Sequence, residues 1–500
     1  MKKILFSLLV MCSMLCSAQN TIPQPKRDFR GAWIQCVNGQ FQGMSTSAMQ
    51  AELTRHLDAL QACNCNVVIF QVRPEADALY NSPYEPWSRF LTGKQGTPPS
   101  PYWDPLAWMV KECHKRGMEL HAWINPFRAK TKGTKEISVI HPYLKNRNNF
   151  FRYDGLILFD PGLPENRTYI CKVAGDIVRR YNVDGLHIDD YFYPYPVAGE
   201  EIPDHYTYES FKRGINNIAD WRRNNVNLFI KELHDTLRAI KPWVKFGVSP
   251  FGIYHNEKAG SNVPGSKTGG LQNYDDLYAD VLKWVDEGWV DYVVPQLYWQ
   301  IGHKTADYKT LVEWWARYCA QRPLIIGQDI ERTMNFQDVD DPTRNQMRAK
   351  YTLQRETSNI SGNCLWYSKN IADNYKNYAT GLARNYQRYP ALQPEMKFMD
   401  DKNPGKVRRL KTVSKDDGLF LCWDAPTARD IMQEATKYVV YRFNNKREMN
   451  LDDPSKIVAI TTEKTLKLPY SNGMTPYYYV VTALDRVQNE SLPKGKIVKL

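Results

Sequence analysis

The amino-acid sequence predicts a parallel (β/α)8 barrel followed by a small all-β domain, and three observations support this. Eight short apolar runs alternate with segments of helical periodicity over roughly 350 residues. After Pro404 the helical periodicity stops and short alternating strands begin. The chain of 500 residues also exceeds the length of an ordinary single domain, so two domains are expected.

The predicted barrel strands read as nearly continuous apolar runs, which is typical of parallel strands buried on both faces. They lie at residues 29–34, 66–72, 118–124, 183–188, 244–249, 291–296, 324–327 and 362–367. A doubly wound open sheet has the same alternation, but it needs a Gly-rich phosphate loop after its first strand. No such loop follows the first run, so the barrel is favoured.

Helices are predicted between these strands, where apolar residues recur at spacings of three and four. One helix is expected to begin with Asp104 as N-cap and Pro105 in its first turn, and to end at Gly117. The other main helical segments are predicted near residues 49–60, 169–181, 211–240, 277–285 and 312–318.

The C-terminal segment, 404–500, has short alternating runs separated by Gly, Pro, Asn and Asp turns. About 100 residues of this kind are typical of a β-sandwich. Trp423, with Tyr478 and Val480, resembles the fibronectin type III arrangement. Strands are predicted at residues 420–423, 438–443, 457–460 and 477–483.

Residues 1–18 read as a secretory signal, which predicts export to the periplasm or the extracellular space. Basic residues precede an apolar stretch, and Cys16-Ser17-Ala18 forms a small-residue cleavage site. Lipid attachment at Cys12 or Cys16 is not favoured, because a bulky residue precedes each cysteine where a small one is needed. No later apolar run is long enough to span a bilayer.

The charge of the chain gives no sign of nucleic-acid binding. The formal net charge is +12, or +10 once the two lysines of the signal are removed. The basic residues are spread among acids and form no nucleic-acid-binding motif.

Eight of the ten cysteines lie beyond the signal, mostly in apolar patterns and without paired CxxC elements. Mostly buried thiols are therefore expected, with at most a disulfide or two.

Polar and aromatic side chains gather where the predicted barrel strands end, and this is the edge of a barrel that carries chemistry. The run 183–188 is followed by two adjacent carboxylates, Asp189 and Asp190. Amides, arginines and aromatic rings follow the other strands. Amides and acids suit the hydroxyls of a sugar and rings suit its C–H faces, while a glycosidase requires two carboxyl groups.

Other chemistries have weaker support. His121, His187 and Asp189 could approach one another and bind zinc, but no HxH or HExxH pair is present. We therefore predict no metal and no cofactor. Ser249 lacks the Gly-x-Ser-x-Gly elbow of a serine hydrolase.

Several motifs along the chain form a recognisable set. They are Phe29-Arg30-Gly31-Ala32-Trp33, Gln71-Val72-Arg73-Pro74, Asp77-Ala78-Leu79-Tyr80, Trp123-Ile124-Asn125-Pro126, Asp160-Pro161-Gly162, the stretch from Asp184 to Tyr191, and Pro295-Gln296-x-Tyr298-Trp299. Together they resemble the glycosyl-hydrolase-like family 10 of bacterial exported proteins over about residues 28–385. The resemblance implies a (β/α)8 barrel that acts on glycosidic bonds of cell-wall or other complex glycans.

The strand that ends at Asp189 is also similar to the nucleophile strand of α-amylase-type barrels, so Asp189 is predicted as the principal carboxylate. Those enzymes carry an acid Glu after strand five, where this chain has Ser249. The partner is therefore sought elsewhere, at Asp190 or Asp77. Substrate binding is predicted for ten further residues: Arg73, Glu75, Asn125, Arg128, Tyr191, Gln296, Tyr298, Trp299, Asp329 and Trp366.

The sequence thus predicts an exported glycoside hydrolase that cleaves glycosidic bonds in peptidoglycan or another complex polysaccharide. A non-catalytic glycan-binding protein and a single-acid lytic transglycosylase are the alternatives. The expected order is a signal peptide at 1–18, a barrel at 28–390 and a fibronectin-like sandwich at 404–500. The last either packs against the barrel or holds glycan, and the structural role is favoured. A glycan partner is expected, with no nucleic acid and no integral membrane span.

Overall fold

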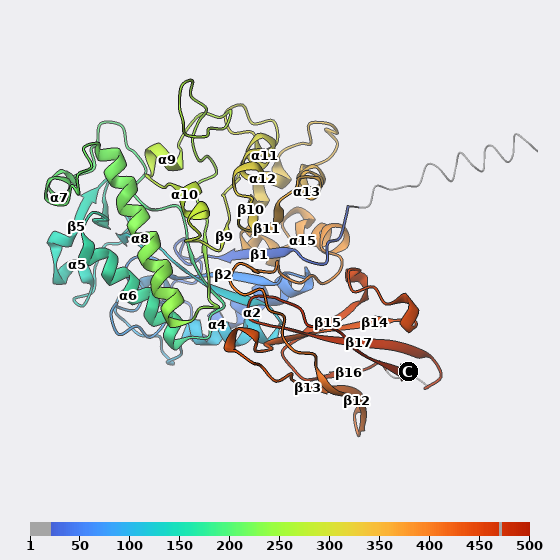
Figure 1. Ribbon diagram of the computed structural model, residues 1–500. Helices are drawn as coiled ribbons and strands as arrows, with labels where there is room; N and C mark the ends of the chain where they lie inside the picture. Colours follow the sequence, from blue (N-terminus) through green and yellow to red (C-terminus); the bar gives the residue numbers. More distant parts are fainter. Residues whose placement is uncertain (1–21, 470–472) are drawn as a thin grey trace, which may run out of the picture.

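A computed structural model describes residues 22–469 and 473–500, so the predicted signal at 1–18 lies outside the described residues. Its centre is a closed barrel of eight parallel strands (Figure 1), which confirms the predicted fold class. β11 pairs back onto β1 to close the barrel. The strands are β1 (Phe29–Ile34), β2 (Val67–Arg73), β3 (Glu119–Ile124), β7 (Gly185–Ile188), β8 (Lys245–Val248), β9 (Tyr292–Val293), β10 (Leu324–Asp329) and β11 (Ile360–Trp366).

Helices follow the strands as the periodicity predicts. In α4, the Asp104 carboxylate caps the helix by accepting from the Ala107 N–H at 3.0 Å, and the chain turns at Gly117, which has φ of 75°. The helices of the barrel are α2 (Thr46–Ala62), α3 (Arg89–Thr92), α4 (Pro105–Lys115), α5 (Pro142–Lys145), α6 (Pro164–Arg180), α7 (His205–Ser210), α8 (Ile218–Ile240), α9 (Asn273–Asp276), α10 (Val281–Asp286), α11 (Tyr308–Tyr318), α12 (Ile330–Asn335), α13 (Met347–Glu356), α14 (Ser368–Ala372) and α15 (Tyr378–Gly381).

The helical segment predicted from residue 211 is shorter than expected. Phe211 and Ile215 lie in the turn between α7 and α8, and α8 begins only at Ile218. The Asn217 side chain accepts from two backbone N–H groups of the first turn, which fixes this start. Apolar residues therefore keep a helical spacing before the helix itself begins. The N-cap residue, Asn217, marks the true start of α8.

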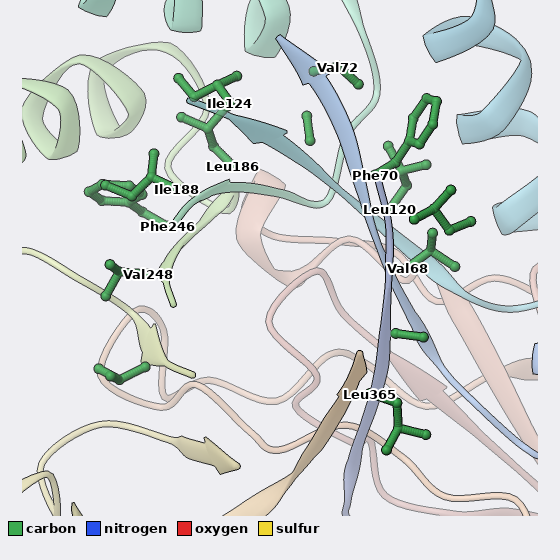
Figure 2. Close-up of a cluster of buried hydrophobic side chains, with 14 of the residues drawn as sticks. Val68, Phe70, Val72, Leu120, Ile124, Leu186, Ile188, Phe246, Val248 and Leu365 are labelled. Carbon is green, nitrogen blue, oxygen red and sulfur yellow. The ribbon is translucent and has the colours of Figure 1, made fainter. Parts of the chain in front are cut away.

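The barrel strands bury their outer faces against the helices. Figure 2 shows this apolar layer, which includes Val68 and Phe70 of β2, Leu186 and Ile188 of β7, and Phe246 of β8. All of these side chains are fully buried. Because side chains alternate along a strand, His187 is left for the interior of the barrel, and Asp189 follows directly after β7 ends at Ile188. The packing of Leu186 and Ile188 against the helices therefore decides which side chains of β7 face the inside of the barrel.

Between β3 and α6 the chain makes an excursion that carries a small antiparallel sheet. Its strands are β4 (Arg128–Lys130), β5 (Phe150–Tyr153) and β6 (Leu156–Phe159), with β6 in the middle. A buried cluster of Phe151, Tyr153 and Leu158 supports it. The excursion starts directly after the end of β3, so it brings Arg128 to the rim of the barrel.

The C-terminal part forms two antiparallel sheets below the barrel in Figure 1. One sheet contains β12 (Arg408–Lys415), β13 (Gly418–Asp424) and β16 (Thr465–Lys467), and the other contains β15 (Ile457–Thr461), β14 (Lys437–Phe443), β17 (Pro476–Leu484) and β18 (Lys494–Lys499). All four predicted strands are present. β12, β16 and β18 were not predicted, because they are short or carry many lysines and arginines, as solvent-exposed edge strands do. The domain limits and the fibronectin-like assignment remain predictions.

The cysteine prediction agrees with the structure. Within the described ranges the eight cysteines are free, and all except Cys422 are buried. No helix in these ranges is long and apolar enough to cross a membrane.

A column of polar side chains runs along the barrel axis. At the bottom Lys245 Nζ lies 2.5 Å from Glu119 Oε2, and both side chains are almost fully buried. Burial alone would raise the pKa of Glu119, but the Lys245 charge and the hydrogen bond from His121 lower it, so Glu119 is ionised. Burial lowers the pKa of His121 and of His187, so both rings are neutral.

The ionised Glu119 decides which atom donates and which accepts in each hydrogen bond of this column. It accepts from His121 Nε2 at 3.1 Å, so His121 Nδ1 accepts from the Tyr292 hydroxyl at 2.6 Å. The Tyr292 oxygen in turn accepts from His187 Nδ1 at 3.0 Å, and His187 Nε2 accepts from the Ser249 hydroxyl at 2.8 Å. Each neutral ring thus donates once and accepts once, and the column ends at Ser249.

The segment before β12 and the loop between β17 and β18 close the bottom of the barrel. Gln488 Nε2 donates to Glu119 Oε1 at 2.7 Å, and Met396 and Val487 join the apolar cluster inside the barrel. Lys437 Nζ of β14 donates to the carbonyl oxygen of Gly117 at 3.2 Å. The C-terminal part therefore completes the hydrogen bonding of a charge in the barrel interior.

We predict that Lys245→Met lowers the free energy of unfolding by about 3–5 kcal/mol, because it leaves the Glu119 carboxylate buried without its cation. The double variant Glu119→Gln/Lys245→Met should cost less than Lys245→Met alone, since no uncompensated charge remains. The measurement is urea unfolding followed by circular dichroism.

Lys283→Met is the matched control, because Lys283 pairs with Glu287 on the exposed surface of α10 at 3.1 Å. Its effect should stay below about 0.5 kcal/mol. If Lys245→Met and Lys283→Met had equal effects, the ion pair would not stabilise the barrel.

Candidate active site

A cavity of about 420 Å³ opens at the carboxyl ends of the barrel strands. Nearly all strands contribute to it, as expected for the functional edge of such a barrel. Its lining residues are Trp33, Gln35, Val37, Gln71, Trp123, Arg128, Asp189, Asp190, Tyr191, Tyr195, Ser249, Phe251, Gln296, Tyr298, Trp299, Arg332 and Trp366.

Asp189 lies deep in this cavity and is only 4% exposed. Trp123 Nε1 donates to its Oδ2 at 3.2 Å, and Asn125 Nδ2 donates to the same oxygen. Its other oxygen, Oδ1, is buried and has no hydrogen-bond partner among the described residues. Burial raises the pKa of Asp189 to about 7, although Arg128 lies near enough to oppose the shift. Asp189 therefore has one oxygen free for a bound molecule, and its carboxyl group gains or loses a proton near neutral pH.

Asp190 reaches the same cavity from the next position in the chain. The Tyr195 hydroxyl donates to Oδ2 and Gln296 Nε2 donates to Oδ1 at 3.1 Å. Burial raises the pKa of Asp190 as well. Adjacent residues within a strand point apart, but β7 ends at Ile188, so the alternation no longer holds at these two positions. Both carboxylates can therefore face one ligand.

Four aromatic rings form a box beside Asp189, which we call the aromatic box: Trp33, Trp123, Tyr298 and Trp366. The ring centroid of Trp366 lies 6.0 Å from Trp33, 6.4 Å from Trp123 and 6.0 Å from Tyr298. Within the described part of the chain, nothing hydrogen-bonds the hydroxyl of Tyr298. The box thus offers apolar faces and one free hydroxyl to the cavity.

Arg128 supplies positive charge at the rim. Its Nε donates to the carbonyl oxygen of Pro74 at 2.8 Å, and its guanidinium lies 5.0 Å from the ring centroid of Tyr191. Nη2 is buried and unpartnered among the described residues. Tyr191 stacks on Tyr195 with ring centroids 5.5 Å apart. This arrangement places an unused donor and an aromatic surface beside the two carboxylates.

Eight of the predicted site residues line the cavity: Asp189, Asp190, Arg128, Tyr191, Gln296, Tyr298, Trp299 and Trp366. Asn125 lies directly behind Asp189 and is fully buried, so it acts by orienting that carboxylate. Gln71 Nε2 donates to the Asn125 side-chain oxygen at 2.8 Å, which fixes the orientation of its amide group.

The other four predicted residues do not line the cavity. Arg73 forms a fully buried ion pair with Glu85 at 2.6 Å and donates to the Asn125 and Pro126 carbonyl oxygens. Glu75 accepts from Thr131, Thr134 and Arg89 and so holds the loop after β4, and Asp77 accepts from Gln95 and from the Glu75 N–H. Asp329 is the N-cap of α12 and accepts from the Arg332 N–H at 2.8 Å. These four side chains therefore hold the loops and the helix start around the cavity and do not face it.

Five lining residues were not singled out from the sequence: Trp33, Val37, Tyr195, Phe251 and Arg332. Trp33 could have been found from the alternation along β1, since Ala32 and Ile34 face the helices. Tyr195 lies in an aromatic and proline-rich stretch that follows Asp190 directly. Arg332 lies in α12, and no sequence signal marks it as a rim residue.

The two histidines considered as metal ligands have other roles. His121 and His187 both hydrogen-bond the Tyr292 hydroxyl, and His187 is tied to Ser249. In the described ranges no group of three or more His, Cys, Asp or Glu side chains is arranged to hold an ion. The cavity itself presents two carboxyl groups, amides, hydroxyls, guanidinium groups and aromatic rings.

Comparisons with known proteins identify the family of the chain. The family described as glycosyl hydrolase-like 10 matches residues 28–348. The chain is 36% identical to glycosyl hydrolase YngK of Bacillus subtilis (strain 168) over 487 residues, which are 95% of this chain and 94% of that protein. It is 34% identical to glycosyl hydrolase DigH of Escherichia coli (strain K12) over 348 residues, 62% of this chain and 78% of that protein.

Among solved structures, the PgaB (BpsB) glycoside hydrolase domain from Bordetella bronchiseptica is similar with a TM-score of 0.46 and 11% identity, covering 73% of this chain and 99% of that chain. The match to the family spans well over half of the residues, and the similarity to YngK extends over nearly the whole chain. The chain belongs to the glycosyl hydrolase-like 10 family.

Proposed function

We propose that the protein is an exported glycoside hydrolase that cleaves glycosidic bonds in peptidoglycan or another complex polysaccharide. Asp189 is its principal carboxylate and Asp190 is the partner. The observation that carries the proposal is that these two carboxylates face one cavity together with free donors and aromatic rings. Glycoside hydrolysis needs a carboxyl group that gives a proton to the leaving oxygen and a second one that stabilises the positive charge on the sugar.

The cavity supports Asp190 over Asp77 as the partner. Asp190 lines it, whereas both oxygens of Asp77 are engaged by Gln95 and by the backbone of Glu75. The two lining carboxylates also favour a hydrolase over a single-acid lytic transglycosylase. Burial raises the pKa of Asp189 to about 7, which suits proton transfer near neutral pH, and a protein that only binds glycan has no need of such a group.

Export and the C-terminal domain are the remaining parts of the proposal. The lysine-led apolar segment at 1–18 supports export by a cleaved signal, and mass spectrometry of the mature N-terminus tests it. The three- and four-stranded sheets after residue 404 support a fibronectin type III-like domain. Its contacts with the barrel floor support a structural role for that domain.

We predict that Asp189→Asn and Asp190→Asn each lower the rate of peptidoglycan cleavage by about 10²–10⁴-fold, because an amide can neither give a proton nor carry the charge. Asp77→Asn should cleave at close to the native rate. The assay is chromatography of the fragments released from purified sacculi, with circular dichroism to confirm folding.

The same fragments separate the alternatives. A hydrolase leaves free reducing ends, whereas a lytic transglycosylase leaves anhydro ends. Full activity of Asp189→Asn on a genuine substrate would exclude Asp189 as the principal carboxylate. If Asp77→Asn were inactive but folded while Asp190→Asn cleaved normally, Asp77 would replace Asp190 as the partner.

We also predict that kcat/KM falls as the pH rises above about 7. Burial raises the pKa of Asp189 to about 7, so the adjacent pair keeps one proton below this pH and loses it above. The acid form needed for leaving-group protonation therefore disappears on the alkaline side. The measurement is initial rate against pH from 4 to 9 in roughly equal steps. A rate that increased steadily to pH 9 would contradict this assignment.

A further inference from the structure

The segment that follows β9 carries three residues of the cavity wall but is only partly held by the barrel sheet. β9 spans two residues, fewer than any other barrel strand. Beyond it, an isolated bridge joins Gln296 to Gly327 of β10, and the Leu297 N–H donates to the Gly327 carbonyl oxygen at 2.9 Å. Strand pairing therefore stops just before Tyr298 and Trp299, whose side chains line the cavity.

Two cationic side chains hold the backbone where the strand pairing stops. Nη1 of Arg332, in α12, donates to the carbonyl oxygen of Tyr298 at 3.1 Å. Nζ of Lys350, in α13, donates to the carbonyl oxygen of Trp299 at 2.9 Å. Two consecutive carbonyl groups that lie beyond the strand pairing are thus each bound by a side chain from a helix that follows later in the chain.

Lys350 is the buried member of this pair. Its side chain is fully buried, whereas Arg332 is exposed. The Lys350 ammonium also donates to Thr333 Oγ1 at 3.1 Å, and that hydroxyl donates to the Asp329 carbonyl oxygen at 2.6 Å. Asp329 is the N-cap of α12. Lys350 therefore ties the Trp299 backbone to the first turn of α12.

A lysine at this position has an energetic cost. Its two acceptors are neutral oxygens, its ammonium lies 4.3 Å from the ring centroid of Tyr308, and it forms no ion pair within the described ranges. Burial lowers the pKa of Lys350 to about 7, although the charge of Asp329 opposes this shift. An apolar side chain of similar length would fill the same space without the desolvation penalty. What the lysine adds is a buried donor for the Trp299 carbonyl.

We propose that Lys350 is a positioning residue of the active site, which holds the Trp299 carbonyl and thereby fixes the Tyr298 and Trp299 rings in the wall of the cavity for sugar binding. Lys350 itself does not line the cavity, so it acts through these two residues. This inference rests on the proposed glycoside hydrolase function and extends the set of residues that serve it.

The position of the Trp299 ring depends on where its backbone is held. The ring centroid lies 5.5 Å from that of Phe251, and a Cβ added at Gly252 would lie 2.5 Å from the ring. The ring is thus seated directly against the backbone of Gly252. A shift of the Trp299 backbone therefore moves the ring away from this seat and changes the shape of the cavity wall.

The hold on Trp299 concerns binding more than the chemical step. Gln296, which donates to Asp190 Oδ1 at 3.1 Å, is still paired with the neighbouring barrel strand. Loss of the Lys350 ammonium therefore leaves the contact to the carboxylate in place and releases only the aromatic rings. Rings that hold a sugar equally in the ground state and the transition state affect KM and leave kcat nearly unchanged.

The experiment measures kcat and KM of Lys350→Met on peptidoglycan glycan strands stripped of peptides. We expect KM to rise about 10-fold while kcat changes by less than about threefold. Lys437→Met is the matched control. Lys437 is also a buried lysine, 6% exposed, and its Nζ donates to the Gly117 carbonyl oxygen at the opposite end of the barrel. Its KM should stay native, and circular dichroism confirms the folding of both variants.

A second variant tests the same contact with a smaller change. Thr333→Val keeps the shape of the side chain but removes the hydroxyl that accepts from Lys350. The ammonium is then held less firmly beneath the Trp299 carbonyl, so KM should rise about threefold with kcat unchanged.

The outcomes separate this inference from the proposed function. A folded Lys350→Met with native KM, a loss confined to kcat, or an equal rise of KM in Lys437→Met would overturn the positioning role and leave the glycoside hydrolase function intact. If Lys350→Met did not fold, a native KM of Thr333→Val would overturn it. Failure of the native protein to cleave peptidoglycan or any other polysaccharide would overturn the proposed function and this inference with it.

Discussion

The buried ion pair between Glu119 and Lys245 is the constraint on which the interior of the barrel depends. A buried charge of this kind is tolerated only if it is paired and hydrogen-bonded, and here His121 and Gln488 donate to Glu119 beside Lys245. The ionised carboxylate then fixes which nitrogen of each axial histidine carries a proton. The donor and acceptor roles of Tyr292 and His187 follow from this. At the cavity end of the column, the Ser249 hydroxyl is therefore oriented toward His187.

This order below the cavity explains why unused polar atoms at the rim are informative. Asp189 Oδ1 and Arg128 Nη2 are buried and unpartnered among the described residues, although the column beneath them is fully paired. Leaving such atoms unpaired costs about 1–3 kcal/mol each. Because Asp189 and Arg128 line the cavity, a bound ligand can supply the hydrogen bonds that these two atoms lack. The raised pKa of Asp189 has the same origin, because burial without full hydrogen bonding disfavours charge.

The barrel could be predicted from sequence because each parallel strand is buried on both faces and reads as an apolar run, as in 66–72. Asp189 and Asp190 could be predicted because they follow such a run directly. Arg73 could not be told apart from them, since its ion-pair partner, Glu85, lies twelve residues away in a loop. Whether a rim side chain points into or out of the cavity depends on loop bends and on irregular strand pairing, such as the register shift in β2 beside Arg73. The periodicity of apolar residues does not predict such bends and shifts.

The position of the C-terminal sheets bears on what the domain can do. Its contacts reach the barrel at the starts of the strands, through Gln488 to Glu119 and through Lys437 to the Gly117 carbonyl. The cavity lies at the opposite ends of the same strands. Side chains of the C-terminal sheets therefore cannot touch a sugar bound at Asp189. Their influence on the site passes through the floor of the barrel, where loss of the Gln488 amide would leave a Glu119 oxygen unsatisfied and weaken the base of the column that orients Ser249.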